Sequence, residues 1–74
     1  MESFNEILAQ IFKIKIEDIR NEMSAKDIPA WDSMNYLLFI AELEKRFDFS
    51  FTMDEVMNAK TVGDLRKAVK ARGK

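Results

Sequence analysis

The chain has 74 residues, a formal net charge of −1 and a hydrophobic share of 47%. A chain of this length has room for one small core and no deep substrate cavity. It contains no cysteine and no histidine, which excludes disulfides, thiolate and imidazole metal sites, catalytic triads and Cys-His nucleophiles. We therefore expect residues 1–74 to form a single domain that is not an enzyme and holds no metal.

The N-terminal residues lack the basic start and the long apolar core of a signal peptide. No uninterrupted apolar run is long enough to span a bilayer. These features predict a cytoplasmic protein without membrane insertion, and we expect it to be a monomer.

The first helix is expected to begin at Phe4, because Ser3-Phe-Asn-Glu6 has the spacing of a capping box. Apolar residues recur at helical spacing and give this helix one inward face. The residues of that face are Phe4, Ile7, Leu8 and Ile11.

Residues 14–32 are expected to form a long ordered loop between the first and second helices. The segment Phe12-Lys-Ile-Lys-Ile16 alternates like a strand, but a lone strand has no stability of its own. Pro29 prevents a helix from running through this region. The side chains expected to anchor the loop are Ile14, Ile16, Ile19 and Ile28.

A second helix is expected to follow Asp32-Ser33, either of which is a suitable N-cap, and to extend to Phe47. Its core-facing stripe is expected to be Tyr36, Ile40, Leu43 and Phe47, with Phe39 adjoining. A second stripe consists of Met34, Leu37, Leu38 and Ala41. Because a helix in so small a bundle seldom buries its full circumference, part of the second stripe should be exposed. Exposure is favoured for Leu38, whereas exposure and burial are balanced for Leu37.

The remaining elements are a short helical segment and a last helix. Residues 54–58 are expected to form one or two helical turns. Thr61-Val-Gly-Asp64 has the spacing of a second capping box, so another helix is expected to begin there. The inward face of the last helix is expected to be Val62, Leu65, Ala68 and Val69. We expect the terminal Arg72-Gly-Lys to be frayed. The elements together predict an all-α fold, a four-helix bundle with three main helices, one short helix and a long loop between helices 1 and 2.

Ser33 has two interpretations. Serine is a common helix N-cap, a role that needs no further purpose. A helix N-terminus also favours a phosphate group, through its free backbone N–H groups and the helix dipole. A serine there could therefore carry a phosphodiester, which another enzyme would have to install because this chain offers no base.

The segment Asp32-Ser33-Met34 resembles the attachment motif Asp-Ser-Leu or Asp-Ser-Met of the acyl carrier proteins, the phosphopantetheine-binding family. The flanking "IPAWDSM" is similar to the Leu-Pro-x-Trp-Asp-Ser form found in many specialised carriers. Three further segments resemble the family in consistent register, although Lys13 replaces a glycine. These segments are "FKIKIEDI" (12–19), "AELEKRF" (41–47) and "TVGDLRKAV" (61–69), so the likeness covers nearly the whole chain.

The resemblance implies a four-helix bundle whose serine, here Ser33, receives phosphopantetheine from coenzyme A. A phosphopantetheinyl transferase would perform this reaction with magnesium and would recognise Asp32 and Met34. The terminal thiol would hold an acyl or aminoacyl group as a thioester. The other partners would be an activating ligase and an acyltransferase or synthase. They would dock on Leu37, Leu38 and Ala41.

The second helix departs from that of carriers in central fatty-acid synthesis, which is usually acidic. Asn35 and Leu38 stand where such carriers tend to have acids, and Lys45-Arg46 adds positive charge. Electrostatic steering of partners should therefore be weaker, and apolar contact should matter more. Together with the Trp-Asp-Ser-Met form, this indicates a dedicated pathway. Candidates are aminoacyl transfer such as D-alanylation, a polyketide or natural-product line, and surface-polysaccharide modification.

Two other classes of function stay open. A non-covalent helical adaptor would dock partners through the apolar stripe of the second helix and would carry no modification at Ser33. A small nucleic-acid-binding bundle would use the basic last helix. The net charge of −1 and the lack of a basic patch interleaved with aromatic residues argue against nucleic acid as a partner.

Overall fold

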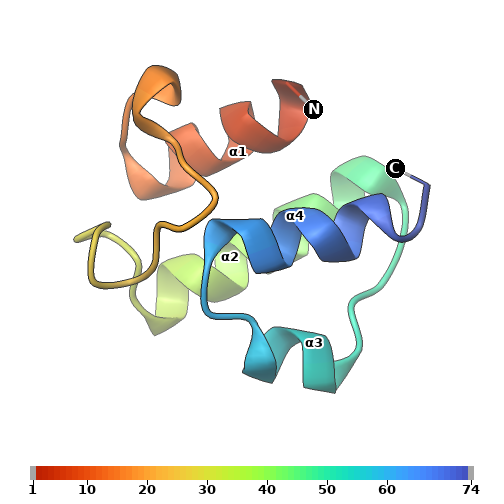
Figure 1. The fold of residues 1–74 in the computed structure, drawn as a ribbon. Coiled ribbons are helices and arrows are strands. Elements are labelled where there is room, and N and C mark those ends of the chain that lie inside the picture. Colours follow the sequence, from red (N-terminus) through yellow and green to blue (C-terminus); the bar gives the residue numbers. More distant parts are fainter. Residues whose placement is uncertain (1, 74) are drawn as a thin grey trace.

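The computed structural model describes residues 2–73 as four α-helices and one 3₁₀ turn (Figure 1). The elements are α1 (Glu2–Phe12), η1 (Ile16–Asp18), α2 (Ser33–Phe47), α3 (Met53–Asn58) and α4 (Val62–Lys70). The expected all-α bundle, with three main helices, a short one and a long loop before α2, is confirmed. Among the described residues, no helix is both long enough and apolar enough to cross a membrane.

α1 begins earlier than expected and ends in a strained residue. Its first residue is Glu2, so Ser3 lies inside the helix. The capping box predicted at Ser3 is therefore wrong, since a cap residue has non-helical backbone angles. After Phe12 comes Lys13 with φ 57°, and the N–H of Ile14 donates to the Ala9 carbonyl (3.2 Å). This is a Schellman ending, in which the left-handed residue is usually glycine. Lys13 stands where carriers of similar sequence have glycine, and its left-handed backbone is the conformation that glycine adopts most easily.

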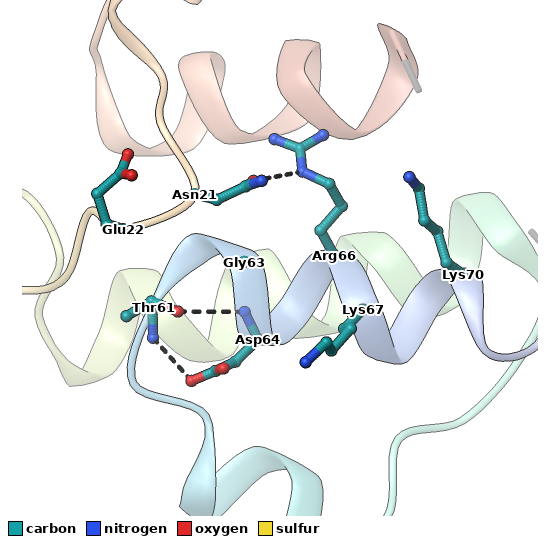
Figure 2. Close-up of a pocket in the computed structure, with 8 residues that line it drawn as sticks. All are labelled: Asn21, Glu22, Thr61, Gly63, Asp64, Arg66, Lys67 and Lys70. Carbon is teal, nitrogen blue, oxygen red and sulfur yellow. Dashed lines mark hydrogen bonds between the residues drawn. The ribbon is translucent and has the colours of Figure 1, made fainter.

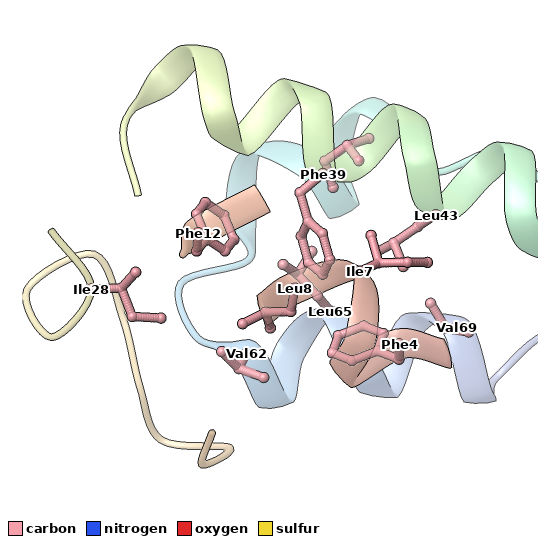
Figure 3. Packing of buried hydrophobic residues seen from close by; sticks show 11 residues of the cluster. Phe4, Ile7, Leu8, Phe12, Ile28, Phe39, Leu43, Val62, Leu65 and Val69 are labelled. Atoms are coloured by element: carbon pink, nitrogen blue, oxygen red, sulfur yellow. The ribbon is translucent and has the colours of Figure 1, made fainter. Parts of the chain in front are cut away.

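The core is built from α1, the α1–α2 loop, α2 and α4 (Figure 3). Phe39 of α2 lies among the aromatic rings of α1, with its ring centroid 5.4 Å from those of Phe4 and Phe12. The predicted core stripe of α2 is confirmed, because Ile40 and Leu43 are buried beside Phe39. The buried residues are Phe4, Ile7, Leu8, Phe12, Ile28, Phe39, Ile40, Leu43, Val62, Leu65 and Val69.

The residues at the margins of the core also follow the predicted helix faces. Tyr36 and Phe47 of α2 are half-buried against the core. Ile11 of α1 is likewise half-buried. On α4, three of the four predicted inward residues are buried, and Ala68 is half-buried.

The loop between α1 and α2 is anchored to the core by fewer isoleucines than expected. Ile28 is fully buried, and Ile14 and Ile19 pack partly against the core. Ile16 is not an anchor, since 48% of its surface is exposed. The expectation fails there because Ile16 opens η1, a 3₁₀ turn in which no residue is buried.

Backbone contacts attach the same loop to the start of α4. The N–H of Val62 donates to the Met23 carbonyl (2.9 Å), and the N–H of Gly63 donates to the Asn21 carbonyl (2.8 Å). A Cβ at position 63 would lie 3.1 Å from both Cβ and the carbonyl oxygen of Asn21. Only glycine allows this approach without displacing the loop. The loop is therefore fixed at both its core side and its α4 side.

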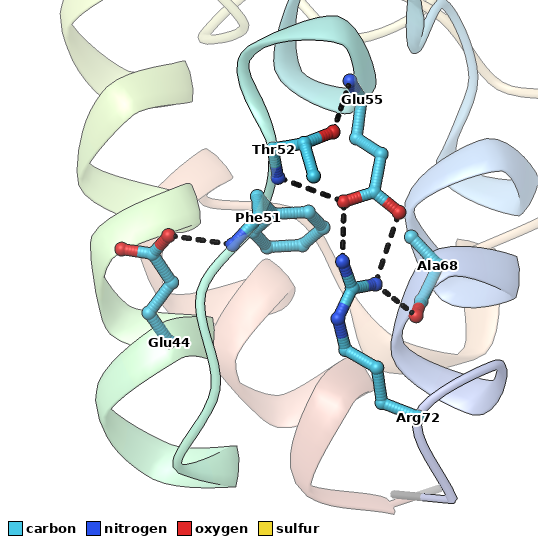
Figure 4. A network of polar contacts seen from close by, with 6 residues as sticks. All are labelled: Glu44, Phe51, Thr52, Glu55, Ala68 and Arg72. Atoms are coloured by element: carbon cyan, nitrogen blue, oxygen red, sulfur yellow. Dashed lines mark hydrogen bonds and ion pairs between the residues drawn. The ribbon is translucent and has the colours of Figure 1, made fainter.

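α3 has no fully buried residue; half-buried Val56 packs against the core, and polar contacts add to this attachment. Figure 4 shows Arg72 paired with Glu55, with nitrogen–oxygen distances of 3.0 and 2.5 Å. Arg72 also donates to the Ala68 carbonyl (2.8 Å), and its guanidinium lies 4.8 Å from the Phe49 ring centroid. The expected fraying of Arg72 and Gly73 is thus wrong for Arg72, which these contacts tie down. Lys74 lies outside the described residues.

The Glu55–Arg72 pair predicts a pH-dependent stability. The hydrogen bond from Arg72, followed by that from the Thr52 backbone, lowers the pKa of Glu55 from 4.5 to about 2. Because the folded pKa lies below the ordinary one, the stabilisation is complete above that ordinary value and is lost as pH falls through the interval. We expect Glu55→Gln to unfold at lower urea concentration than wild type at neutral pH. The two midpoints should converge as the pH approaches 2, and a gap that is constant with pH would contradict this account.

The two faces of α2 predict unequal costs of truncation. Leu43 is fully buried, whereas 53% of the Leu38 surface is exposed. Leu43→Ala should lower the free energy of unfolding by about 2–5 kcal/mol, through lost burial and a residual cavity. Leu38→Ala should lower it by less than about 1 kcal/mol. Urea denaturation followed by circular dichroism measures both, and equal losses would refute the assignment of the two faces.

Candidate functional site

A short turn delivers the chain to the start of α2. The N–H of Trp31 donates to the Ile28 carbonyl (3.0 Å), and the N–H of Asp32 donates to the Ala30 carbonyl (2.9 Å). The side-chain amide of Asn35 donates to the same Ala30 carbonyl (2.9 Å). Asn35 therefore ties the first turn of α2 to the turn that precedes it. The sequence indicated only that Asn35 stands where fatty-acid carriers tend to have an acidic residue, and it did not predict this hydrogen bond.

Asp32, and not Ser33, caps α2. Its backbone is extended (φ −111°, ψ 178°), and its Oδ1 accepts a hydrogen bond from the N–H of Asn35 (2.8 Å). Ser33 is the first helical residue and is exposed. Within residues 2–73 the Ser33 hydroxyl makes no hydrogen bond. The sequence left open which of the two residues is the N-cap; it is Asp32. The Ser33 hydroxyl therefore does not cap the helix.

The surroundings of the Ser33 hydroxyl suit an attached phosphate. The N–H groups of Ser33 and Met34 begin the helix and have no acceptor within the described part of the chain. Such groups form the positive end of the helix dipole and favour an anion. The Asp32 carboxylate is a nearby negative charge, but its capping bond uses one oxygen. Two free N–H groups beside one carboxylate suit the single negative charge of a phosphodiester on Ser33 better than a free multivalent anion, which the carboxylate would repel more strongly.

An aromatic wall stands beside Ser33. The Trp31 ring stacks on Phe12 (centroids 5.2 Å, 17°) and on Tyr36 (5.9 Å, 14°). The Tyr36 hydroxyl donates to the Val56 carbonyl (2.6 Å), which joins α2 to α3. Burial, together with the negative charge of Asp64, raises the pKa of Tyr36. An open depression of about 400 Å³ lies against this wall. It is lined by Ala25, Trp31, Asp32, Ser33 and Tyr36.

The second stripe of α2 is exposed, as predicted for Leu38. Leu37, for which exposure and burial were balanced, is also exposed, as are Met34 and Ala41. On α3, the side chains of Met53 and Met57 are about as exposed as Met34. Sequence reasoning did not single out these two methionines. Their spacing of four residues on a helix too short to bury two faces is the signal that could have found them.

A separate charged depression of about 500 Å³ lies between the α1–α2 loop and α4 (Figure 2). Arg66, which lines it, donates to Asn21 (2.9 Å) and to Asn5 (2.8 Å) and lies over the Phe4 ring. Beside it, Asp64 and Thr61 form the capping box of α4. Hydrogen bonds from the N–H groups of Lys60 and Thr61 lower the pKa of Asp64. Arg66 thus attaches the loop and α1 to α4, and none of these three residues lines the depression at Ser33.

Within residues 2–73, no group of three or more Asp and Glu side chains is placed to hold a metal ion. The site beside Ser33 therefore consists of a hydroxyl, a capped helix terminus and an aromatic wall. This set contains no histidine, and its carboxylate, that of Asp32, caps α2 through Oδ1.

Comparisons with known proteins agree with this geometry. The family model described as the phosphopantetheine attachment site matches residues 3–69. The structure resembles that of a Mycobacterium tuberculosis protein assigned as an acyl carrier protein, with TM-score 0.85, 28% identity, and coverage of 96% of this chain and 95% of that one. It also resembles the solution structure of the holo acyl carrier protein from Geobacter metallireducens, with TM-score 0.84, 33% identity and coverage of 97% and 86%.

A comparison with curated proteins gave no significant match. The family match spans most of the chain, and both structural relatives share the helical fold. The chain therefore belongs to the phosphopantetheine-binding family of acyl carrier proteins, and it is a non-catalytic carrier.

Proposed function

We propose that Ser33 is the residue that carries phosphopantetheine and that residues 1–74 act as one carrier domain. The carrier would hold an acyl or aminoacyl group as a thioester and deliver it between enzymes of a dedicated pathway in the cytoplasm. The observation that carries the assignment is the exposed Ser33 hydroxyl, which has no hydrogen bond within residues 2–73 because Asp32 supplies the cap. The arm supplies a thiol to a chain that has no cysteine.

A phosphopantetheinyl transferase would install the arm from coenzyme A. The bond between Ser33 Oγ and the phosphorus forms as that phosphorus separates from adenosine 3′,5′-bisphosphate. The hydroxyl proton passes to a base of the transferase, since the chain has no histidine and the carboxylate next to Ser33, that of Asp32, is oriented by its capping bond to the Asn35 N–H. The N–H groups of Ser33 and Met34 favour the negative charge of the product.

Asp32 and Met34 are the residues that we assign to recognition by the transferase. Asp32 has a fixed orientation because its Oδ1 accepts the capping bond. Met34 directly follows the serine, and 72% of its surface is exposed. A partner that approaches the Ser33 hydroxyl would meet both side chains.

Leu37, Leu38 and Ala41 are the residues that we assign to docking of the activating ligase and the acyltransferase or synthase. All three are exposed on one side of α2. The first turn of α2 contains no acidic residue, and its last turn contains Lys45 and Arg46. Docking should therefore depend on apolar burial more than on steering by charge. This balance supports a dedicated pathway, with D-alanylation, a polyketide or natural-product line, or surface-polysaccharide modification as candidates.

The attachment site is tested by mass spectrometry. Incubation with a broad-specificity phosphopantetheinyl transferase, magnesium and coenzyme A should add the mass of one phosphopantetheine to wild type and to Ser50→Ala, the control at another exposed serine. Ser33→Ala should gain no mass. Because Asp32 holds the cap, Ser33→Ala should change the free energy of unfolding by less than about 0.5 kcal/mol. Unchanged mass in wild type would favour the non-covalent adaptor.

The docking residues are tested by Leu38→Glu in the modified protein. A carboxylate pressed against an apolar partner surface is desolvated, which should cost on the order of 1–3 kcal/mol and slow cargo loading by the cognate ligase. Ile16→Glu is the matched control, because Ile16 is similarly exposed but lies in η1. Loading rates should fall for Leu38→Glu alone. Equal rates for Leu38→Glu and wild type would remove Leu38 from the interface.

A further inference from the structure

We propose that the depression beside Ser33 is a resting site for the pantoyl segment of the arm, with Trp31 as its main contact. This inference rests on the proposed attachment at Ser33. Ser33 itself lines the depression together with Trp31, Tyr36, Asp32 and Ala25. An arm that leaves the Ser33 hydroxyl thus starts at the edge of the depression, and its first segment meets the wall at the high effective concentration of a tethered group.

The lining matches the chemistry of that segment. The pantoyl unit follows the phosphate directly and carries two methyl groups on one carbon, then a hydroxyl and an amide. Trp31, Tyr36 and Ala25 offer apolar surface to the methyl groups. Asp32 offers its Oδ2, which makes no hydrogen bond within residues 2–73, as an acceptor for the hydroxyl or the amide N–H. The lining therefore offers both the apolar and the polar contacts that the pantoyl unit can use.

Contacts within the protein hold the aromatic wall in place before any arm is attached. Trp31 is stacked with both Phe12 and Tyr36, and the Tyr36 hydroxyl is fixed to the Val56 carbonyl at 2.6 Å. The loop that carries Ala25 is held by the bridge between Ser24 and Thr61. A preformed surface avoids the entropic cost of ordering side chains when a ligand segment settles on it.

The resting site would leave Leu38, one of the proposed docking residues, accessible. Residues three apart on a helix share a face, so Ser33 and Tyr36 lie together on one side of α2. Leu38 is displaced from Tyr36 by two residues, about 200° around the helix. A partner could therefore contact Leu38 while the arm still rests on Trp31.

The experiment uses Trp31, the only tryptophan, as a reporter. The chain has no cysteine, so iodoacetamide can cap the arm thiol selectively and remove quenching by the thiol. Acrylamide quenching of Trp31 is compared between unmodified and capped, modified protein, after mass spectrometry has confirmed complete modification. We expect a lower quenching constant in the modified protein. Nuclear Overhauser effects between the pantoyl methyl protons and the Trp31 indole protons should appear.

Ala25→Glu places a carboxylate in the depression, and Ala71→Glu is the matched control at another exposed alanine. Ala25→Glu should lose both signals after modification, whereas Ala71→Glu should keep them. Complete modification of wild type with neither signal would overturn the resting site and leave the attachment at Ser33 standing. Signals that persist in Ala25→Glu would move the contact outside the depression. Failure of wild type to gain mass would refute the attachment and the resting site together.

Discussion

The contact of Phe39 with the aromatic rings of α1 fixes the rotation of α2 about its own axis, and the properties of the site follow from that rotation. Phe39 lies 5.4 Å from both Phe4 and Phe12, ring centroid to ring centroid. Each residue advances about 100° around a helix, so burying Phe39, Ile40 and Leu43 turns Leu38 outward. The exposed apolar stripe is thus a direct consequence of how the core is packed.

Periodic patterns in the sequence predicted what depends on one helix face, and they failed where contacts between distant segments decide. The stripe of α2 and the capping box at Thr61 are properties of neighbouring residues, and both were predicted. The predictions that Ile16 anchors the loop and that Arg72 is frayed were wrong, because contacts with other segments decide the burial of Ile16 and the order of Arg72. Ile16 loses its core contact to the turn η1, and Arg72 is ordered by Glu55, 17 residues earlier. The resemblance named Ser33, but it could not show that Asp32 holds the cap.

The division of work between Asp32 and Ser33 connects helix formation to modification. A serine that capped α2 would lose its cap when its oxygen became esterified, so modification would weaken the helix that presents it. With Asp32 as the cap, the helix start and the attachment point are adjacent but independent. Asn35 contributes to the same arrangement through its bond to the Ala30 carbonyl. An acid at that position could accept hydrogen bonds but could not donate this one at neutral pH. An uncharged amide at position 35 therefore has a structural role, the hydrogen bond to Ala30, besides any effect on partners.

The loop that precedes Ser33 and the short helix α3 are held by different kinds of interaction. Ile28 in the core and the close approach of Gly63 to Asn21 fix the loop before Ser33. α3 has no fully buried residue; it is held by half-buried Val56, which packs against the core, by the Tyr36 hydroxyl bond and by Glu55–Arg72. Hydrophobic burial does not depend on the protonation of side chains, whereas an accessible ion pair is weakened by acid and screened by salt. α3 should therefore loosen before the loop and α2 do, and Tyr36 is the side chain through which that loosening would reach the aromatic wall beside Ser33.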